Sequence, residues 1–130
     1  MSDIENMDFE ADFNHWLNSC LTEELPADVE GFCFNLYETV HGFGVELVGT
    51  SEFDEENPDW ACEEIFEPKQ RKLDIPIDYS GSHWEQCLET MIVLVEKYLK
   101  SNEAGVTGLK RAKGLGIGFV DGDLQLLARP

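Results

Sequence analysis

Seven carboxylates gather between residues 52 and 64, and they carry the clearest chemical signal in this sequence. Together with a tryptophan they form the set Glu52, Asp54, Glu55, Glu56, Asp59, Trp60, Glu63 and Glu64. Clustered carboxylates can hold a hard cation, exchange protons or attract a basic macromolecule. The segment lacks the alternating acids and central glycine of an EF-hand loop, so a calcium site is not indicated. We therefore predict that this set is a contact surface for a positively charged partner.

Trp60 fits two roles in this segment. An aromatic side chain ringed by charges, here Asp59, Glu63 and Glu64, is typical of a protein interface anchor. A tryptophan followed by apolar residues is equally typical of a core position. The sequence leaves both roles open.

The charge along the chain is uneven. Residues 1–68 contain 19 Asp and Glu and no Lys or Arg, whereas the remaining 8 acids accompany all 9 bases, for a net charge of −18. A hydrophobic content of 42% is too high for a disordered acidic tail, so the acids belong to a folded surface. Such a surface repels nucleic acid and anionic membranes and attracts cationic proteins. We expect a basic protein partner, no nucleic acid and no membrane.

The other residue types that could act in catalysis do not form a set. His15, His41 and His83 fall on different predicted elements, and no nucleophile with a base has a local signature. Glycines at every second position of 114–118 miss the dinucleotide-binding spacing and are not followed by a helix. They leave one strand face bare, where a helix or another backbone can approach closely. We predict no enzymatic activity, no cofactor and no metal site.

Cys20, Cys33, Cys62 and Cys87 are spread along the chain without a C-x-x-C pair. Three of them lie within apolar patterns, which predicts reduced thiols in the core. No apolar run approaches the roughly 18–20 residues of a membrane span, and the N-terminus is acidic where a signal peptide would be basic. These observations predict one domain, residues 1–130, in the cytoplasm.

Two helices are needed to position these residues. Apolar side chains repeat at helical spacing from Phe9 to Leu21, with Asp8 as a candidate N-cap and Pro26 as a stop. The second pattern predicts a long helix over residues 82–100, where Ser82 and Glu85 have the spacing of a capping box. Its predicted apolar face is Trp84, Leu88, Met91, Ile92, Val95, Tyr98 and Leu99. A helical turn is expected over residues 106–111.

Alternating segments predict the strands. Residues 31–40 and 45–50 form one hairpin, residues 60–66 and 73–77 are extended, and Pro76 suits a sheet edge. Asp121-Gly122 predicts a terminal hairpin. The fold class is therefore α+β, with an antiparallel sheet of about four or five strands and an N-terminal helix and one long central helix packed on it.

Four segments of the chain, residues 32–38, 46–50, 59–61 and 118–124, resemble the small acidic immunity proteins that bacteria encode beside polymorphic or contact-dependent growth inhibition toxins. The resemblance covers about half of the chain and transfers no catalytic residue. It implies that the protein binds a cognate toxin, often a basic nuclease encoded by the adjacent gene, and neutralises it by occluding its active site or substrate surface.

Two other functions stay open. An acidic adaptor, or a regulatory protein that imitates nucleic acid toward its partner, would use the same surface. A small metal-assisted hydrolase would use clustered carboxylates, although with 27 acids some pair is always close in space, so proximity alone identifies no site.

Overall fold

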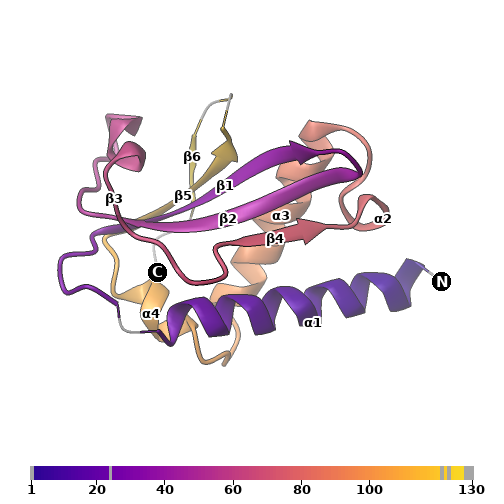
Figure 1. The fold of residues 1–130 in the computed structure, drawn as a ribbon, viewed down its shortest axis with the longest axis horizontal. Coiled ribbons are helices and arrows are strands. Elements are labelled where there is room, and N and C mark those ends of the chain that lie inside the picture. The colour runs from indigo at the N-terminus through magenta and orange to yellow at the C-terminus, as the bar shows by residue number, and fades with distance from the viewer. Residues whose placement is uncertain (1, 24, 121, 123, 128–130) are drawn as a thin grey trace.

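The chain forms a six-stranded mixed sheet (Figure 1). A computed structural model describes residues 2–23, 25–120, 122 and 124–127, with side chains from Phe9 onward. The strands are β1 (Gly31–Thr39), β2 (Gly42–Thr50), β3 (Glu64–Phe66), β4 (Lys72–Ile75), β5 (Gly114–Phe119) and β6 (Gln125–Leu126). Their order is β3-β2-β1-β5-β6, and β4 also pairs with β2, on the side away from β1.

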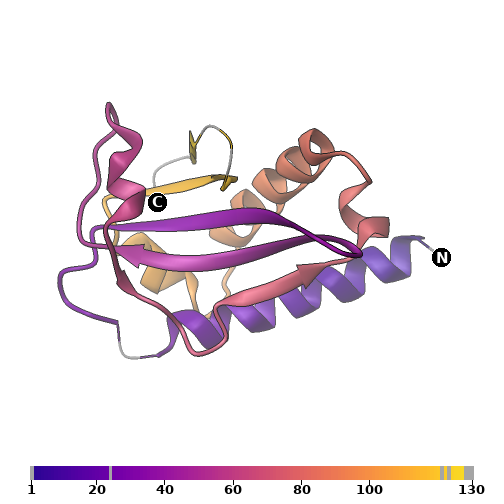
Figure 2. The same cartoon turned by 45° about the horizontal axis from the view of Figure 1, so that its top comes forward.

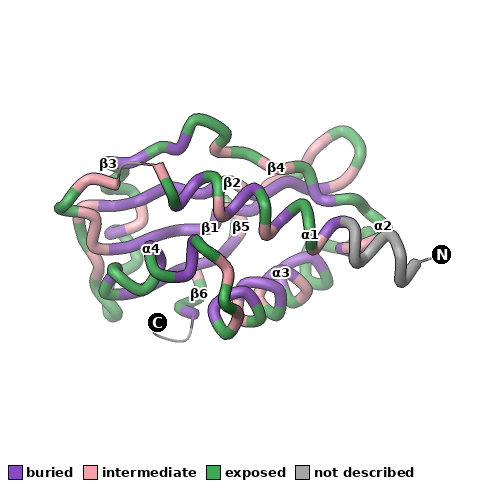
Figure 3. The backbone as a smooth tube through the Cα atoms, turned by 90° about the horizontal axis from the view of Figure 1, so that it is seen from below, coloured by how far each residue is buried: buried purple, intermediate pink, exposed green. Residues whose placement is uncertain are grey.

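Helices cover one face of this sheet. They are α1 (Ser2–Leu21), α2 (Ile77–Ser80), α3 (Trp84–Leu99) and α4 (Val106–Lys110), and a short 3-10 helix, η1 (Pro58–Cys62), lies apart from them. Figure 3 shows α1 and α3 with their buried positions turned toward the sheet and their exposed positions turned away. The predicted α+β class, with an N-terminal helix and one long helix packed on the sheet, is confirmed.

The main core lies between the helices and the sheet. Strand alternation sends Phe32, Phe34 and Leu36 of β1 toward the helices, along with Leu115 and Ile117 of β5. They meet the buried stripes of α1 and α3 in one continuous cluster. The core therefore holds the central strands β1 and β5 against the helices.

A smaller core lies on the opposite face, at the end of the sheet where β1 begins. Cys33, Val48 and Trp60 form it, and Phe53 and Leu124 pack against it. This face has room for them because β5 presents glycines there: a Cβ on Gly114 would collide with the Phe53 ring, and one on Gly116 would lie 3.0 Å from Trp60. The bare strand face predicted from the glycine spacing is present, but side chains such as those of Phe53 and Trp60 fill it, and not a helix or another backbone.

One strand pair is parallel. The sheet is largely antiparallel, as predicted, but β1 pairs with β5 in parallel from Gly31 opposite Gly114 to Leu36 opposite Phe119. The connection between them passes through α3 and α4, as a parallel pair requires a long crossover. The terminal hairpin is confirmed by the pairing of β5 with β6, although Asp121 itself lies outside the described residues.

Both main helices begin at positions other than those expected. Helix α1 begins at Ser2 rather than after Asp8, because residues 2–7 contain no helix breaker, while the apolar stripe that signals the helix starts only at Phe9. Helix α3 follows the short α2 and begins at Trp84, with His83 as N-cap and no side-chain capping bond. The predicted capping box is therefore not formed.

Residues 60–66 are not one extended strand. Asn57 accepts a hydrogen bond from the Asp59 backbone N–H, and Pro58 starts η1, which contains Trp60. Only Glu64–Phe66 pairs with β2. Strand β4 ends at Ile75, and Pro76 caps α2, which begins at Ile77. The extended segment predicted over residues 73–77 is therefore shorter, and Pro76 lies outside the sheet instead of at its edge, because its fixed φ suits the start of a helix. Within the described residues, no helix is long and apolar enough to cross a membrane.

Candidate partner-binding surface

The predicted acidic residues lie on one projection of the molecule, residues 51–66, which we name the acidic lobe. The lobe leaves the end of β2, passes through η1 and returns to the sheet as β3. Figure 2 shows it rising at the end of the sheet where β1 begins, on the face opposite α1. Its exposed carboxylates are Glu52, Asp54, Glu55, Glu56, Asp59, Glu63 and Glu64.

Trp60 is a core residue in this structure. Its side chain is 2% exposed, and its ring lies 4.9 Å from the ring of Phe53 at an angle of 63°. The indole Nε1 has no hydrogen-bond partner within the described residues. Of the two roles left open by the sequence, Trp60 has the structural one. Its buried ring packs the lobe against the sheet, and the exposed positions of the predicted set are the acids.

Local hydrogen bonds shape the tip of the lobe. The Asp54 carboxylate accepts a hydrogen bond of 2.9 Å from the backbone N–H of Glu56, and Asn57 does the same for Asp59 at 3.1 Å. Short polar side chains favour turns in this way because they satisfy backbone donors locally. Only the backbone of Glu56 and Asp59 takes part in these two bonds, and both residues are exposed.

Arg71 neutralises the base of the lobe but not its tip. Its guanidinium lies 3.2 Å from Glu46, 3.2 Å from Glu64 and 2.9 Å from Glu67. The hydrogen bond that Arg71 donates to the Glu67 carboxylate is the main reason that the pKa of Arg71 is raised, with Glu46 adding to it. Glu64 is therefore the one predicted contact residue that the structure places in this internal network.

The other ion pairs also join the two halves of the chain. Lys97 pairs with Glu10 at 2.7 Å, and Lys113 pairs with Glu30 at 2.8 Å. Each ion pair seen among the described residues thus links a cation of the second half to an acid of the first half. Within that part of the chain, no cation lies at ion-pair distance from five lobe carboxylates, those of Glu52, Asp54, Glu56, Asp59 and Glu63.

The buried thiols have the chemistry of core residues. Burial raises the pKa of Cys20, Cys33 and Cys87 to about 12, so these thiols are protonated at neutral pH and are poor nucleophiles. Cys62 is exposed at the end of η1. In the ranges that the structure describes, no three His, Cys, Asp or Glu side chains gather in a way that could hold a metal ion.

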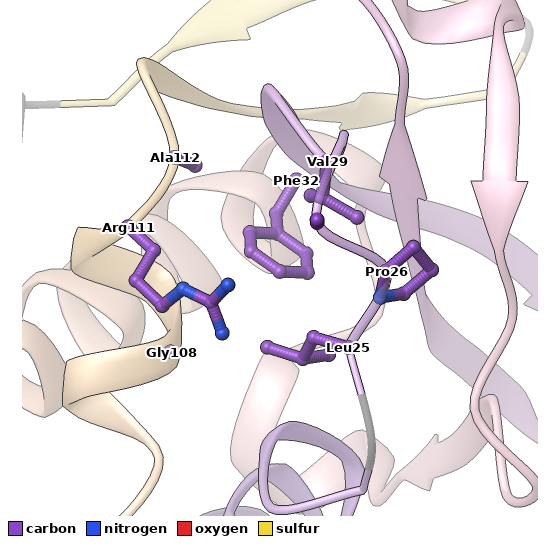
Figure 4. A pocket seen from close by; sticks show the side chains of 8 residues that line it. Leu25, Pro26, Val29, Phe32, Gly108, Arg111 and Ala112 are labelled. Atoms are coloured by element: carbon purple, nitrogen blue, oxygen red, sulfur yellow. The ribbon is translucent and has the colours of Figure 1, made fainter.

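A small hollow beside α4 is too narrow for a ligand. It lies between residues 25–32 and 108–112, and Figure 4 shows the Arg111 guanidinium turned toward Phe32 and Leu25. Its volume of about 40 Å³ accommodates a few water molecules at most. Unlike Lys113, Arg111 has no acid at ion-pair distance among the described side chains.

A second surface was missed by the sequence analysis. A groove of about 480 Å³ is lined by Tyr37, Glu38, Trp84, Phe119, Val120 and Gly122. Trp84 was expected in the apolar face of the long helix, but it is 51% exposed, because it is the first residue of α3 and turns toward Phe119 instead of the core. The polar residues Glu85 and Gln86 after it were the available signal that the stripe begins later.

Comparison of the chain with protein-family models, with curated proteins and with solved structures finds no match.

Proposed function

We propose that this protein is an immunity-type inhibitor that binds a basic toxin domain, encoded by the adjacent gene, and neutralises it by covering its active site or substrate surface. The acidic lobe is the proposed contact. Inhibition is stoichiometric, needs no catalytic residue in this chain, and takes place in the cytoplasm, where a nuclease toxin would meet its substrate.

The observation that supports this proposal is which acids have a cation at ion-pair distance and which do not. The cations that form ion pairs among the described residues, Arg71, Lys97 and Lys113, pair with acids outside the lobe tip, for example Lys97 with Glu10 and Arg71 with Glu46. The lobe tip keeps exposed carboxylates with no cation at ion-pair distance among the described residues, including those of Glu56 and Asp59.

A toxin that acts on nucleic acid suits such a surface. Its substrate groove must be basic because it attracts a polyanion. A protein that projects carboxylates into that groove competes with the substrate, and long-range attraction speeds the encounter. The rigid attachment of the lobe through Trp60 also limits the entropy lost when the partner binds.

The test is co-purification of this chain with the protein encoded by the adjacent gene, followed by association kinetics. Charge reversal of Glu56, Asp59 and Glu63 to Lys should slow association at least about ten-fold at low salt and abolish neutralisation of the toxin. Raising the salt concentration should slow association of the unaltered protein toward that of the variant.

A matched control reverses three exposed acids on the helical side, Asp12, Asp78 and Glu89, and changes the net charge by the same amount. We expect association of this control to slow much less than that of the lobe variant. Equal effects of the two variants would show that total charge, and not the lobe, controls binding. Absence of any complex with a basic neighbour would refute the immunity function.

A further inference from the structure

The groove missed by the sequence analysis lies at the other end of β1 from the acidic lobe. Its walls come from the end of β1, the end of β5 and the start of α3. Figure 1 shows these elements together at the end of the sheet away from η1 and β3. Gly31 beneath the lobe and Tyr37 in the groove are about 20 Å apart, since a strand advances about 3.3 Å per residue.

Aromatic rings hold the groove wall in a fixed shape. The Trp84 ring packs edge-on against Phe119 at 6.0 Å and 80°. Phe119 packs in turn against the buried Phe43 at 5.5 Å and 78°. Trp84 is nevertheless 51% exposed, and the neighbouring Val120 is 60% exposed. The wall is thus anchored in the core on one side and open to a ligand on the other.

One acidic side chain also lines this groove. Glu38 is exposed and lines the groove, with no cation at ion-pair distance among the described residues. Burial, followed by the charges of Asp74 and Glu46, raises the pKa of Tyr37. The Lys72 ammonium lies 5.4 Å from the centre of the Tyr37 ring, and the Tyr37 side chain leaves β1 on the face opposite that of Glu38.

We propose that the groove is a binding site for an arginine side chain of a cationic protein segment, with the guanidinium stacked on Trp84 and hydrogen-bonded to Glu38. A ring face attracts a cation through its quadrupole, and a carboxylate beside it adds a charged acceptor. Arginine suits this pair of groups better than lysine because its planar guanidinium stacks and donates hydrogen bonds at the same time.

The charge of the groove favours an arginine over an anionic or a purely apolar ligand. An anionic ligand would be repelled by Glu38 and by the net charge of −18. A purely apolar segment would leave Glu38 partly desolvated and unpaired. An arginine satisfies both the rings and the carboxylate.

This inference deepens the proposed function and rests on it only for the identity of the partner. A basic protein that meets both surfaces would be held at two points, near the start and near the end of β1, by charge at the lobe and by an arginine in the groove. Aromatic anchors commonly dominate the binding energy of interfaces, whereas exposed charges mainly affect the association rate. The groove should therefore control dissociation.

The groove can be tested without the toxin. The probe is a capped glycine-arginine-glycine peptide titrated into the labelled protein, and the readout is the NMR signal of the Trp84 indole N–H, assigned with Trp84→Phe. The control peptide carries citrulline, which has nearly the same shape but no charge. We expect a saturable shift with arginine and a shift at least about five-fold smaller with citrulline at equal concentration. Equal shifts from both peptides, or no shift from either, would overturn the proposal.

Variants separate ring stacking from apolar contact. With the Val120 methyl signals as readout, Trp84→Phe should keep most of the affinity for the arginine peptide, and Trp84→Leu should lose about three-fold more. Glu38→Gln should weaken binding as well, whereas Val93→Ala, which removes an exposed apolar side chain elsewhere on α3, should not. Equal affinity of the Phe and Leu variants would refute the stacking role.

The two proposals fail in different ways. If the arginine peptide shifts Trp84 but no basic neighbour binds the protein, the groove stands and the immunity function fails. If the toxin binds and Trp84→Leu changes neither the affinity for the arginine peptide, read from the Val120 methyl signals, nor the dissociation rate of the toxin, the function stands and the groove fails.

Discussion

At the scale of single residues, Arg71 connects the sheet to the acidic lobe. It contacts Glu46 on β2, Glu64 on β3 and Glu67 just after β3, and its side chain is only 26% exposed. Glu46 also accepts a hydrogen bond of 3.1 Å from the Asn35 side-chain amide. A chain of polar contacts therefore runs from the middle of β1 to the base of the lobe.

Removing this cation should destabilise the protein. Arg71→Met leaves three carboxylates close together, and we expect the free energy of unfolding to fall by about 1–3 kcal/mol. Arg71→Lys should recover part of the loss, because it restores the charge but not the forked geometry. Urea denaturation measures both variants, and equal stability of Arg71→Met and the unaltered protein would show that these ion pairs contribute nothing.

At the scale of elements, the glycine face of β5 determines where the lobe can sit. Phe53 and Trp60 reach the sheet only because Gly114 and Gly116 have no side chains. Neither glycine has a positive φ, so their role is to leave space rather than to allow an unusual backbone. The lobe is thus attached by packing at its base while its tip remains in solvent.

Gly114→Ala should displace Phe53 and loosen the lobe. We expect a loss of about 1–3 kcal/mol in unfolding free energy from overpacking, and faster cleavage by a glutamate-specific protease within residues 52–56. Adding Phe53→Ala should remove most of the extra effect, because the colliding ring is gone. Strictly additive effects of the two substitutions would contradict the predicted contact.

The sequence pattern defined elements better than it defined their neighbours. Alternation in β1 and the stripe of α3 identified which side chains face the core, because burial follows periodicity. The parallel pairing of β1 with β5 could not be predicted from the sequence pattern, because alternation determines which face a side chain is on but not which strand lies beside it. The acids of the lobe could be singled out because they lie close together in the sequence. The groove could not, because it combines Glu38, Trp84 and Phe119 from three separate elements.

At the scale of the whole molecule, the charge of −18 should limit stability. Like charges on a compact body repel one another, and the described ion pairs offset only part of this repulsion. The lobe tip concentrates several of the uncompensated acids. The proposed binding function and the stability of the fold therefore make opposite demands on these acids.

Charge reversal at the lobe tip should reveal this conflict. We expect the variant with Glu56, Asp59 and Glu63 changed to Lys to melt a few degrees higher than the unaltered protein at low salt, because repulsion is relieved. In about 1 M NaCl, where the Debye length is about 3 Å, the difference should largely disappear while the unaltered protein gains stability. Thermal unfolding at both salt concentrations measures these shifts. A lower melting temperature for the variant at low salt would mean that these carboxylates stabilise the fold, and they could then no longer be regarded as residues held free for a partner.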